Sequence, residues 1–307
     1  MTWAPRSRGE GAPWIVDAHV SDIPLSRKLP LLIHNLQRSF PGESLDIQRG
    51  EESRLSNLME DMNRARVAVS LVVLSEETGE FLRLAGQYPN RLFGLASYDP
   101  LSPRQGLDRI QELREAHPNL IVGVTAAISG LHQDPRLKDF APLYEYCVQH
   151  DLPIQFCPDD SSAGERSVQP TAFAVLARTY PRLKVVCRYV ETWDENAMEY
   201  LRRFPNLFLQ VAGLPQTEGS EISRCLQTLL RRVGSRKMLF ASDWRGRDPT
   251  YFQQVETVRR LPWWQRCNIG WRTAVRLYGL RMPRAQRSAH NSQPWKRTIR
   301  ERLKADR

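Results

Sequence analysis

Short apolar runs and helical segments alternate along this chain, and the alternation recurs eight times. Residues 67–74 form a continuous apolar run, which is typical of a parallel strand covered on both faces. Residues 54–66, just before it, carry apolar side chains at the spacing of one helix face. Strand–helix alternation at this count predicts an α/β protein with a single (β/α)8 barrel, a TIM barrel, rather than an open sheet.

The same patterns give the approximate bounds of each element. The predicted strands cover residues 14–20, 67–74, 91–97, 120–126, 152–157, 183–189, 207–211 and 238–241. The predicted helices cover 54–66, 80–87, 103–116, 140–150, 171–179, 196–203 and 222–233, with closing helices at 251–260 and 264–278. We expect residues 1–13 to form a flexible arm, 14–280 the barrel and 281–307 a basic C-terminal tail.

Composition excludes several classes of protein. Hydrophobic residues make up 41% and charged residues 25% of the chain, so global disorder is excluded. No apolar stretch is long enough for a membrane span, and the N-terminus lacks the apolar run of a signal peptide. Five widely spaced cysteines without a CxxC motif argue against a disulfide scaffold or a zinc ribbon. These features predict a cytoplasmic location.

The net charge of +10 is concentrated in the tail. Residues 281–307 hold nine Lys or Arg and two Asp or Glu, a balance of +7, which leaves +3 for the other 280 residues. A solvated tail explains this pattern better than a nucleic-acid surface, and no RNA-recognition or zinc-finger motif is present. Phosphate-binding glycine loops and a GxSxG motif are also absent. We therefore expect a small-molecule substrate, no nucleic acid and no cofactor; a homodimer is compatible with the sequence.

Several motifs in a fixed order resemble those of one family. They include IVDAHVS at the first strand, YPNRLFGLASYDP at the third, YPRLKVVCRYVETW at the sixth and KMLFASDW at the eighth. In this order and spacing they are similar to the amidohydrolase-related TIM-barrel family, in the branch of carboxylic-acid decarboxylases and small-molecule hydrolases. The resemblance runs over residues 15–280, and it implies a site at the carboxyl ends of the strands.

The metal ligands of that family are mostly replaced. The resemblance implies a divalent metal held by His-x-His on the first strand, one His each on the fifth and sixth, and Asp on the eighth. This chain has His19 and Ser21, then Cys157, then Tyr189, and only Asp243 completes the pattern. Neutral Ser and Tyr are poor zinc ligands, so we predict no tightly bound metal. Two interpretations of Cys157 stay open: a third ligand beside His19 and Asp243, or a small buried hydrophobe.

Three residues are candidates for catalysis: Asp243, His19 and Tyr189. Asp243 and His19 retain the family's positions, and the first and eighth strands of a closed barrel are neighbours. A carboxylate–imidazole pair can move a proton near neutral pH. The alternatives are that Asp243 caps a loop and that His19 is a hydrogen-bonded structural residue. Tyr189 could donate a hydrogen bond or a proton.

Other polar residues at the strand ends could contact a substrate. The candidates are Ser21, Cys157, Asp159, Arg188 and Arg245. Alternation along a strand allows only one of Arg188 and Tyr189 to line the barrel mouth, and the motif favours Tyr189. Arg245 could hold a carboxylate or a phosphate, or it could be a solvated loop residue.

Together these observations predict a metal-independent enzyme that acts on a small carboxyl- or carbonyl-containing compound by acid–base catalysis. Hydrolysis, decarboxylation or related lyase or cyclase chemistry would fit, and secondary metabolism is a suitable setting. The alternative is a catalytically inactive relative that binds a ligand or stabilises a partner. A mouth plugged by Trp244 would favour that alternative. Trp263, Trp264 and Trp271 in the closing helices are expected in the core.

Overall fold

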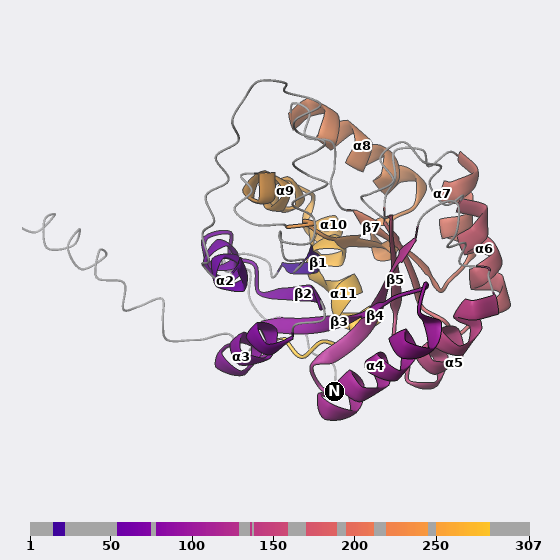
Figure 1. Cartoon of the computed structure of the whole chain (residues 1–307). Coiled ribbons are helices and arrows are strands. Elements are labelled where there is room, and N and C mark those ends of the chain that lie inside the picture. Colours follow the sequence, from indigo (N-terminus) through magenta and orange to yellow (C-terminus); the bar gives the residue numbers. More distant parts are fainter. Residues whose placement is uncertain are drawn as a thin grey trace, which may run out of the picture.

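Eight parallel strands, hydrogen-bonded in sequence order, form the centre of the molecule in the computed structural model (Figure 1). The structure describes residues 15–21, 54–74, 78–128, 136, 138–158, 170–188, 195–211, 219–244 and 250–282. The strands are β1 Val16–Ser21, β2 Val69–Leu74, β3 Leu92–Tyr98, β4 Ile121–Ile128, β5 Ile154–Pro158, β6 Val185–Arg188, β7 Leu207–Val211 and β8 Met238–Phe240. The prediction of a single (β/α)8 barrel is confirmed.

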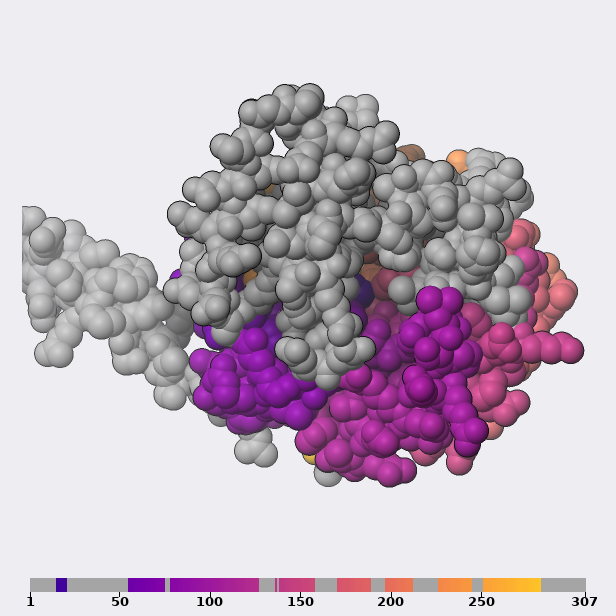
Figure 2. All heavy atoms as spheres, in the orientation of Figure 1, coloured from indigo at the N-terminus to yellow at the C-terminus, as the bar shows by residue number. Residues whose placement is uncertain are grey.

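Helices surround the sheet in the order of the chain, except the last two, which overlap the centre of the barrel in this view (Figure 1). They are α2 Arg54–Arg64, α3 Gly79–Gln87, α4 Pro103–Ala116, α5 Ala141–Gln149, α6 Pro170–Thr179, α7 Glu195–Arg203, α8 Gly219–Arg232, α9 Thr250–Arg259, α10 Trp263–Cys267 and α11 Thr273–Tyr278. Side chains of α2 to α5 form one continuous flank of the molecule (Figure 2, purple to magenta). In the part of the chain that the structure describes, no helix is long and apolar enough to cross a membrane.

The barrel closes between its first and last strands. A single parallel bridge pairs Val20 with Trp244, and the backbone N–H of Asp243 donates to the carbonyl of His19 at 3.2 Å. The closing seam therefore runs through both family positions that this sequence retains.

The N-terminal end of the barrel is filled by apolar side chains, which we call the barrel floor. It consists of inward-facing residues of the strands and residues of α11, among them Val16, Leu71, Val186, Leu239, Leu277 and Tyr278. Gly123 makes room for this plug, because a Cβ there would lie 3.0 Å from the Tyr278 ring and 3.1 Å from the Pro153 carbonyl oxygen. Burying this apolar surface stabilises the barrel and closes it to solvent from below.

The C-terminal helical run differs from the sequence prediction in two ways. A π-helical segment, η4 (Asn268–Arg272), separates α10 from α11 within the run expected as one helix. Trp263 and Trp264 are 57% and 56% exposed, so their expected place in the core is wrong, whereas Trp271 packs against the barrel floor. The two exposed rings lie on the first turn of a five-residue helix, and the Arg272 guanidinium lies 5.3 Å from the Trp263 ring centroid.

Candidate active site

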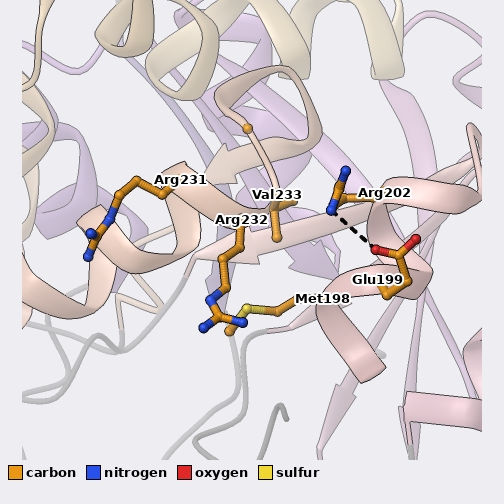
Figure 3. Close-up of a pocket in the computed structure, with 7 residues that line it drawn as sticks. Met198, Glu199, Arg202, Arg231, Arg232 and Val233 are labelled. Atoms are coloured by element: carbon orange, nitrogen blue, oxygen red, sulfur yellow. Dashed lines mark hydrogen bonds and ion pairs between the residues drawn. The ribbon is translucent and has the colours of Figure 1, made fainter. Parts of the chain in front are cut away.

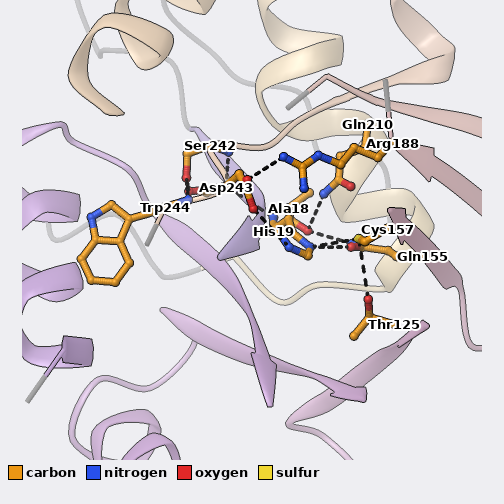
Figure 4. Close-up of polar contacts among 11 residues, drawn as sticks. Ala18, His19, Thr125, Gln155, Cys157, Arg188, Gln210, Ser242, Asp243 and Trp244 are labelled. Carbon is orange, nitrogen blue, oxygen red and sulfur yellow. Dashed lines mark hydrogen bonds and ion pairs between the residues drawn. The ribbon is translucent and has the colours of Figure 1, made fainter. Parts of the chain in front are cut away.

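Polar side chains replace apolar ones at the carboxyl end of the barrel, on the inward-facing positions of the strands (Figure 4). We call this group the mouth cluster. It comprises His19, Thr125, Gln155, Cys157, Arg188, Gln210 and Asp243. Their strands β1, β4, β5, β6, β7 and the segment after β8 all end here, so residues far apart in the sequence share one small volume.

A β-bulge turns His19 into the mouth. Asp17 pairs with Ser70 and Val20 pairs with Val72, so three steps along β1 match two steps along β2. The extra residue shifts the alternation of side chains, and His19 faces inward while Val20 packs under the helices. The backbone irregularity thus decides the direction of a candidate catalytic side chain.

Asp243 has a left-handed backbone, with φ of +55°, immediately after β8. Aspartate adopts this conformation more readily than most residues, and neighbouring contacts hold it there. Asp17 accepts hydrogen bonds from the Ser242 N–H at 2.9 Å and from the Ser242 hydroxyl at 2.5 Å. Burial raises the pKa of Asp17 to about 6, although the bonds from Ser242 oppose this shift.

An ion pair lies at the centre of the mouth cluster. The Arg188 Nη2 atom lies 2.5 Å from Asp243 Oδ2, and His19 Nε2 lies 3.6 Å from Asp243 Oδ1 (Figure 4). The side chains of all three residues are largely buried, at 14%, 11% and 5% exposed. One carboxylate therefore lies between a guanidinium and an imidazole in a place with little water, where such interactions are strong.

Gln155 fixes the ring of His19. The Gln155 Nε2 atom donates to the Ala18 carbonyl at 2.8 Å and contacts the Tyr278 hydroxyl at 2.6 Å. Its Oε1 atom then faces His19 Nδ1 at 3.0 Å, so that Nδ1 carries the proton. Burial alone lowers the pKa of His19, but Cys157, Asp243 and Gln155 outweigh it and raise the pKa to about 9.

Cys157 contacts the same ring nitrogen of His19 as Gln155 does. Its Sγ atom is 3.8 Å from His19 Nδ1 and 3.8 Å from the Thr125 hydroxyl oxygen. Burial raises the pKa of this thiol, but the charge and hydrogen bond of His19 outweigh burial, and Arg188 and Thr125 add to them, so the pKa is lowered overall.

These side chains do not fit the divalent metal implied by the family resemblance. Cys157 faces Nδ1 of His19, whereas Asp243 faces Nε2, so the three donors do not converge on one point. The Arg188 guanidinium pairs with Oδ2 of Asp243, which puts a positive charge next to any cation at this carboxylate. No group of three or more His, Cys, Asp or Glu residues in the described ranges is arranged to hold a metal ion.

The structure places some of the predicted site residues and leaves others outside the described residues. Asp243, His19, Cys157 and Arg188 come together in the mouth cluster, and Ser21 ends β1. Tyr189, Asp159 and Arg245 lie outside the described residues.

Arg188 lines the mouth, whereas the motif favoured Tyr189, which lies outside the described residues. Val186 belongs to the barrel floor, so alternation along β6 turns Arg188, two residues later, inward as well.

Sequence reasoning missed Asp17, Gln155 and Ser242 and gave no role to Thr125 and Gln210. Gln155 lies two residues before Cys157, so both side chains face the same side of β5. A polar residue at this position in an apolar strand could have indicated a second site residue. Asp17 is also a polar residue in an apolar strand, but nothing in the sequence places it next to Ser242.

Trp244 does not plug the mouth. Its ring is fully buried on the helix side of the barrel, and its Nε1 atom donates to Asp61 in α2 at 3.0 Å. Figure 4 shows the ring pointing away from the mouth cluster.

Two cavities lie elsewhere on the described surface. One of about 580 Å³ is lined by residues of α7, α8 and the turn after α8, with an ion pair between Arg202 and Glu199 at 3.3 Å (Figure 3). Another of about 320 Å³ lies at the amino end of the strands, next to Lys184 and Tyr278. Neither cavity is lined by a residue of the mouth cluster.

Comparison with known proteins supports the fold and identifies the family. A family model described as amidohydrolase matches residues 62–280. The 5-carboxyvanillate decarboxylase of Sphingomonas paucimobilis is 17% identical, with a TM-score of 0.62 over 87% of this chain and 99% of that one. An amidohydrolase from Burkholderia multivorans with bound zinc is 18% identical, with a TM-score of 0.62 over 87% and 100%.

A 2,6-dihydroxybenzoate decarboxylase from Rhizobium is 16% identical, with a TM-score of 0.56 over 87% of this chain and 99% of that one. No curated protein sequence matches the chain. Identities this low show a common fold, whereas the family model covers well over half of the chain. The motifs, the barrel and this match agree, and the chain belongs to the amidohydrolase family.

Proposed function

We propose that this protein is an enzyme of the hydrolase or lyase kind that acts on a small organic acid or related carbonyl compound without a metal. The observation that carries the proposal is the 2.5 Å ion pair between Arg188 and Asp243 at the barrel mouth. This pair puts a fixed positive charge where the family resemblance implies a divalent cation.

Arg188 would supply the electrostatic part of catalysis. A guanidinium has five N–H donors, and its ion pair with Asp243 uses one of its nitrogens. Donors held in place in a poorly hydrated site stabilise a carboxylate or a developing oxyanion more than donors in water do.

His19 and Asp243 would move the proton. His19 carries a proton at neutral pH because its pKa is raised to about 9, so it can serve as a general acid. Asp243 lies between the two basic side chains and can accept a proton from substrate or water. Asp243 could also cap the loop after β8, and that structural role would not prevent proton transfer.

The solved structures that share the fold favour the same kind of substrate. They include decarboxylases of 5-carboxyvanillate and 2,6-dihydroxybenzoate and a 4-oxalomesaconate hydratase, all of which act on organic acids. Decarboxylation, hydrolysis and related lyase or cyclase reactions all fit this set. The cytoplasmic location, the homodimer and a place in secondary metabolism stay predictions.

The test is turnover after metal removal. Protein dialysed against a chelator would be screened against a panel of small aromatic and aliphatic carboxylic acids and their esters. We expect turnover that is unchanged by the chelator and that falls about 100-fold in Arg188→Met. Arg202→Met, which removes an exposed guanidinium on α7, serves as the control and should keep full turnover.

Loss of turnover on chelation, with recovery on adding zinc or manganese, would contradict the proposal. Binding of acids from the panel without any turnover would instead support the inactive, ligand-binding alternative.

A further inference from the structure

Two buried cysteines on neighbouring strands have opposite surroundings. Cys157 on β5 faces inward to the mouth cluster and keeps 9% of its surface exposed. Cys187 on β6 faces the helix layer, has no exposed surface and packs in the outer apolar core. The difference points to a role for Cys157 that packing alone does not require.

The neighbours of Cys157 are those of an activated thiol. His19 Nδ1 and the Thr125 hydroxyl lie 3.8 Å from Sγ on two sides, and the Arg188 charge acts on it as well. Together they lower the pKa of Cys157 despite burial. Burial without such neighbours raises the pKa of Cys147 to about 12 and that of Cys187 well above its ordinary value. A thiolate beside an imidazolium is a strong nucleophile.

A second, independent feature of the mouth is a buried oxygen atom of Gln210 that could accept a hydrogen bond from a ligand. Gln210 on β7 is fully buried, and its Nε2 atom donates to the Ala18 carbonyl at 3.3 Å. Its Oε1 atom is buried and meets no hydrogen-bond donor in the described part of the chain. Gln210 pairs with Arg188 in the sheet register, and Figure 4 shows the two side chains next to each other. A substrate or water that donates a hydrogen bond would satisfy this oxygen.

We propose that Cys157 is the nucleophile of a covalent acyl-transfer reaction, with His19 as its proton partner and Arg188 as the stabiliser of the oxyanion. This inference rests on the proposed function and narrows it to hydrolysis of a small acyl ester, thioester or amide.

The step balances with water as the only co-reactant. Sγ of the thiolate forms a bond to the carbonyl carbon, and the carbonyl electron pair moves to oxygen, beside Arg188. The C=O bond re-forms as the bond to the leaving group breaks, and the leaving group takes the proton from His19. Water then gives a proton to His19 and attacks the thioester, which releases the carboxylic acid and restores the thiolate.

Alkylation tests the nucleophile without a known substrate. The intact protein would be treated with iodoacetamide near neutral pH, and modification of each cysteine followed by peptide mass spectrometry. We expect Cys157 to react at least about 10-fold faster than Cys147, Cys187 and Cys267, and to lose this advantage in His19→Gln. Equal rates, or a rate at Cys157 that His19→Gln leaves unchanged, would overturn the inference.

A generic acyl donor tests the covalent step. With p-nitrophenyl acetate we expect a burst of about one nitrophenolate per protein and an acetyl group on Cys157. Cys157→Ala should abolish both, whereas Cys187→Ala, the matched control on the next strand, should keep them. Absence of the acetylated thiol would overturn the inference.

These outcomes separate the two proposals. If Cys157→Ala keeps the metal-independent turnover of a panel substrate, the inference fails and the proposed function stands. If turnover proves to need a metal while Cys157 reacts selectively, the proposed function fails and the reactive thiol remains.

Discussion

The two ends of the barrel interior are built from different chemistry. The floor is apolar and is plugged by Leu277 and Tyr278 of α11. The mouth, a few residues further along the same strands, carries a buried ion pair, an imidazole and a thiol. Leu239 on the floor and Asp243 at the mouth are only four positions apart. This division separates the burial that stabilises the barrel from the groups that could perform chemistry.

Truncating the floor should have the largest effect on stability. Leu71 is fully buried among floor residues, so Leu71→Ala leaves a cavity and should cost about 3–5 kcal/mol of unfolding free energy. Urea denaturation would measure this cost, and turnover of the remaining folded protein should stay near wild type. Leu101→Ala, at an exposed position, is the control. A large loss of turnover per folded molecule would show that the two ends are coupled.

Asp243→Asn removes a charge at the mouth and leaves the floor unchanged. Asparagine tolerates the left-handed backbone and keeps the shape, but it cannot accept the proton or balance Arg188. We expect turnover to fall about 100-fold or more, and the melting temperature to fall as well because the buried Arg188 guanidinium loses its partner, while the protein stays folded. Asp151→Asn is a matched control, because Asp151 also has a positive φ, of 56°, but lies exposed before β5. Full activity of Asp243→Asn would place the chemistry elsewhere, and unfolding would identify a structural cap.

Sequence patterns were sufficient to predict the strands of the barrel, but they were insufficient to predict which side chains face its mouth. Apolar runs and helix spacing are local signals, and they predicted every strand and the buried face of α2. The inward turn of His19 depends on an extra residue in β1 relative to β2, which is a property of the pairing and not of either segment alone. Arg188 faces inward because it follows the floor residue Val186 by two positions, which the family motif alone does not show. The exposure of the first turn of α10 depends on what packs beside it, which the helical spacing does not show.

The pH dependence of the stability difference between wild type and His19→Gln reports on the mouth. The pKa of His19 in the folded protein, about 9, lies above its ordinary value of 6.5, so folding is favoured by proton binding. This contribution is complete below about pH 6.5 and is lost as the pH rises through about 9. The stability advantage of wild type over His19→Gln should therefore shrink between about pH 6 and pH 10, measured as urea midpoints. A constant difference would contradict the protonated imidazole; His150→Gln, at an exposed position, is the control.

Gln155 touches both ends of the barrel interior, and its contact with the floor gives the smallest expected effect. Tyr278→Phe removes the hydroxyl at 2.6 Å from Gln155 Nε2, while the bond from Nε2 to the Ala18 carbonyl at 2.8 Å remains. Since that second bond still orients the amide toward His19, we expect a loss of only about 1 kcal/mol and an unchanged rate of Cys157 alkylation. Tyr98→Phe, whose hydroxyl donates to the Asp139 carbonyl outside the barrel, is the matched control. If Tyr278→Phe slows alkylation of Cys157 and Tyr98→Phe does not, then the floor positions the imidazole through Gln155, and the separation of the two ends is incomplete at this one side chain.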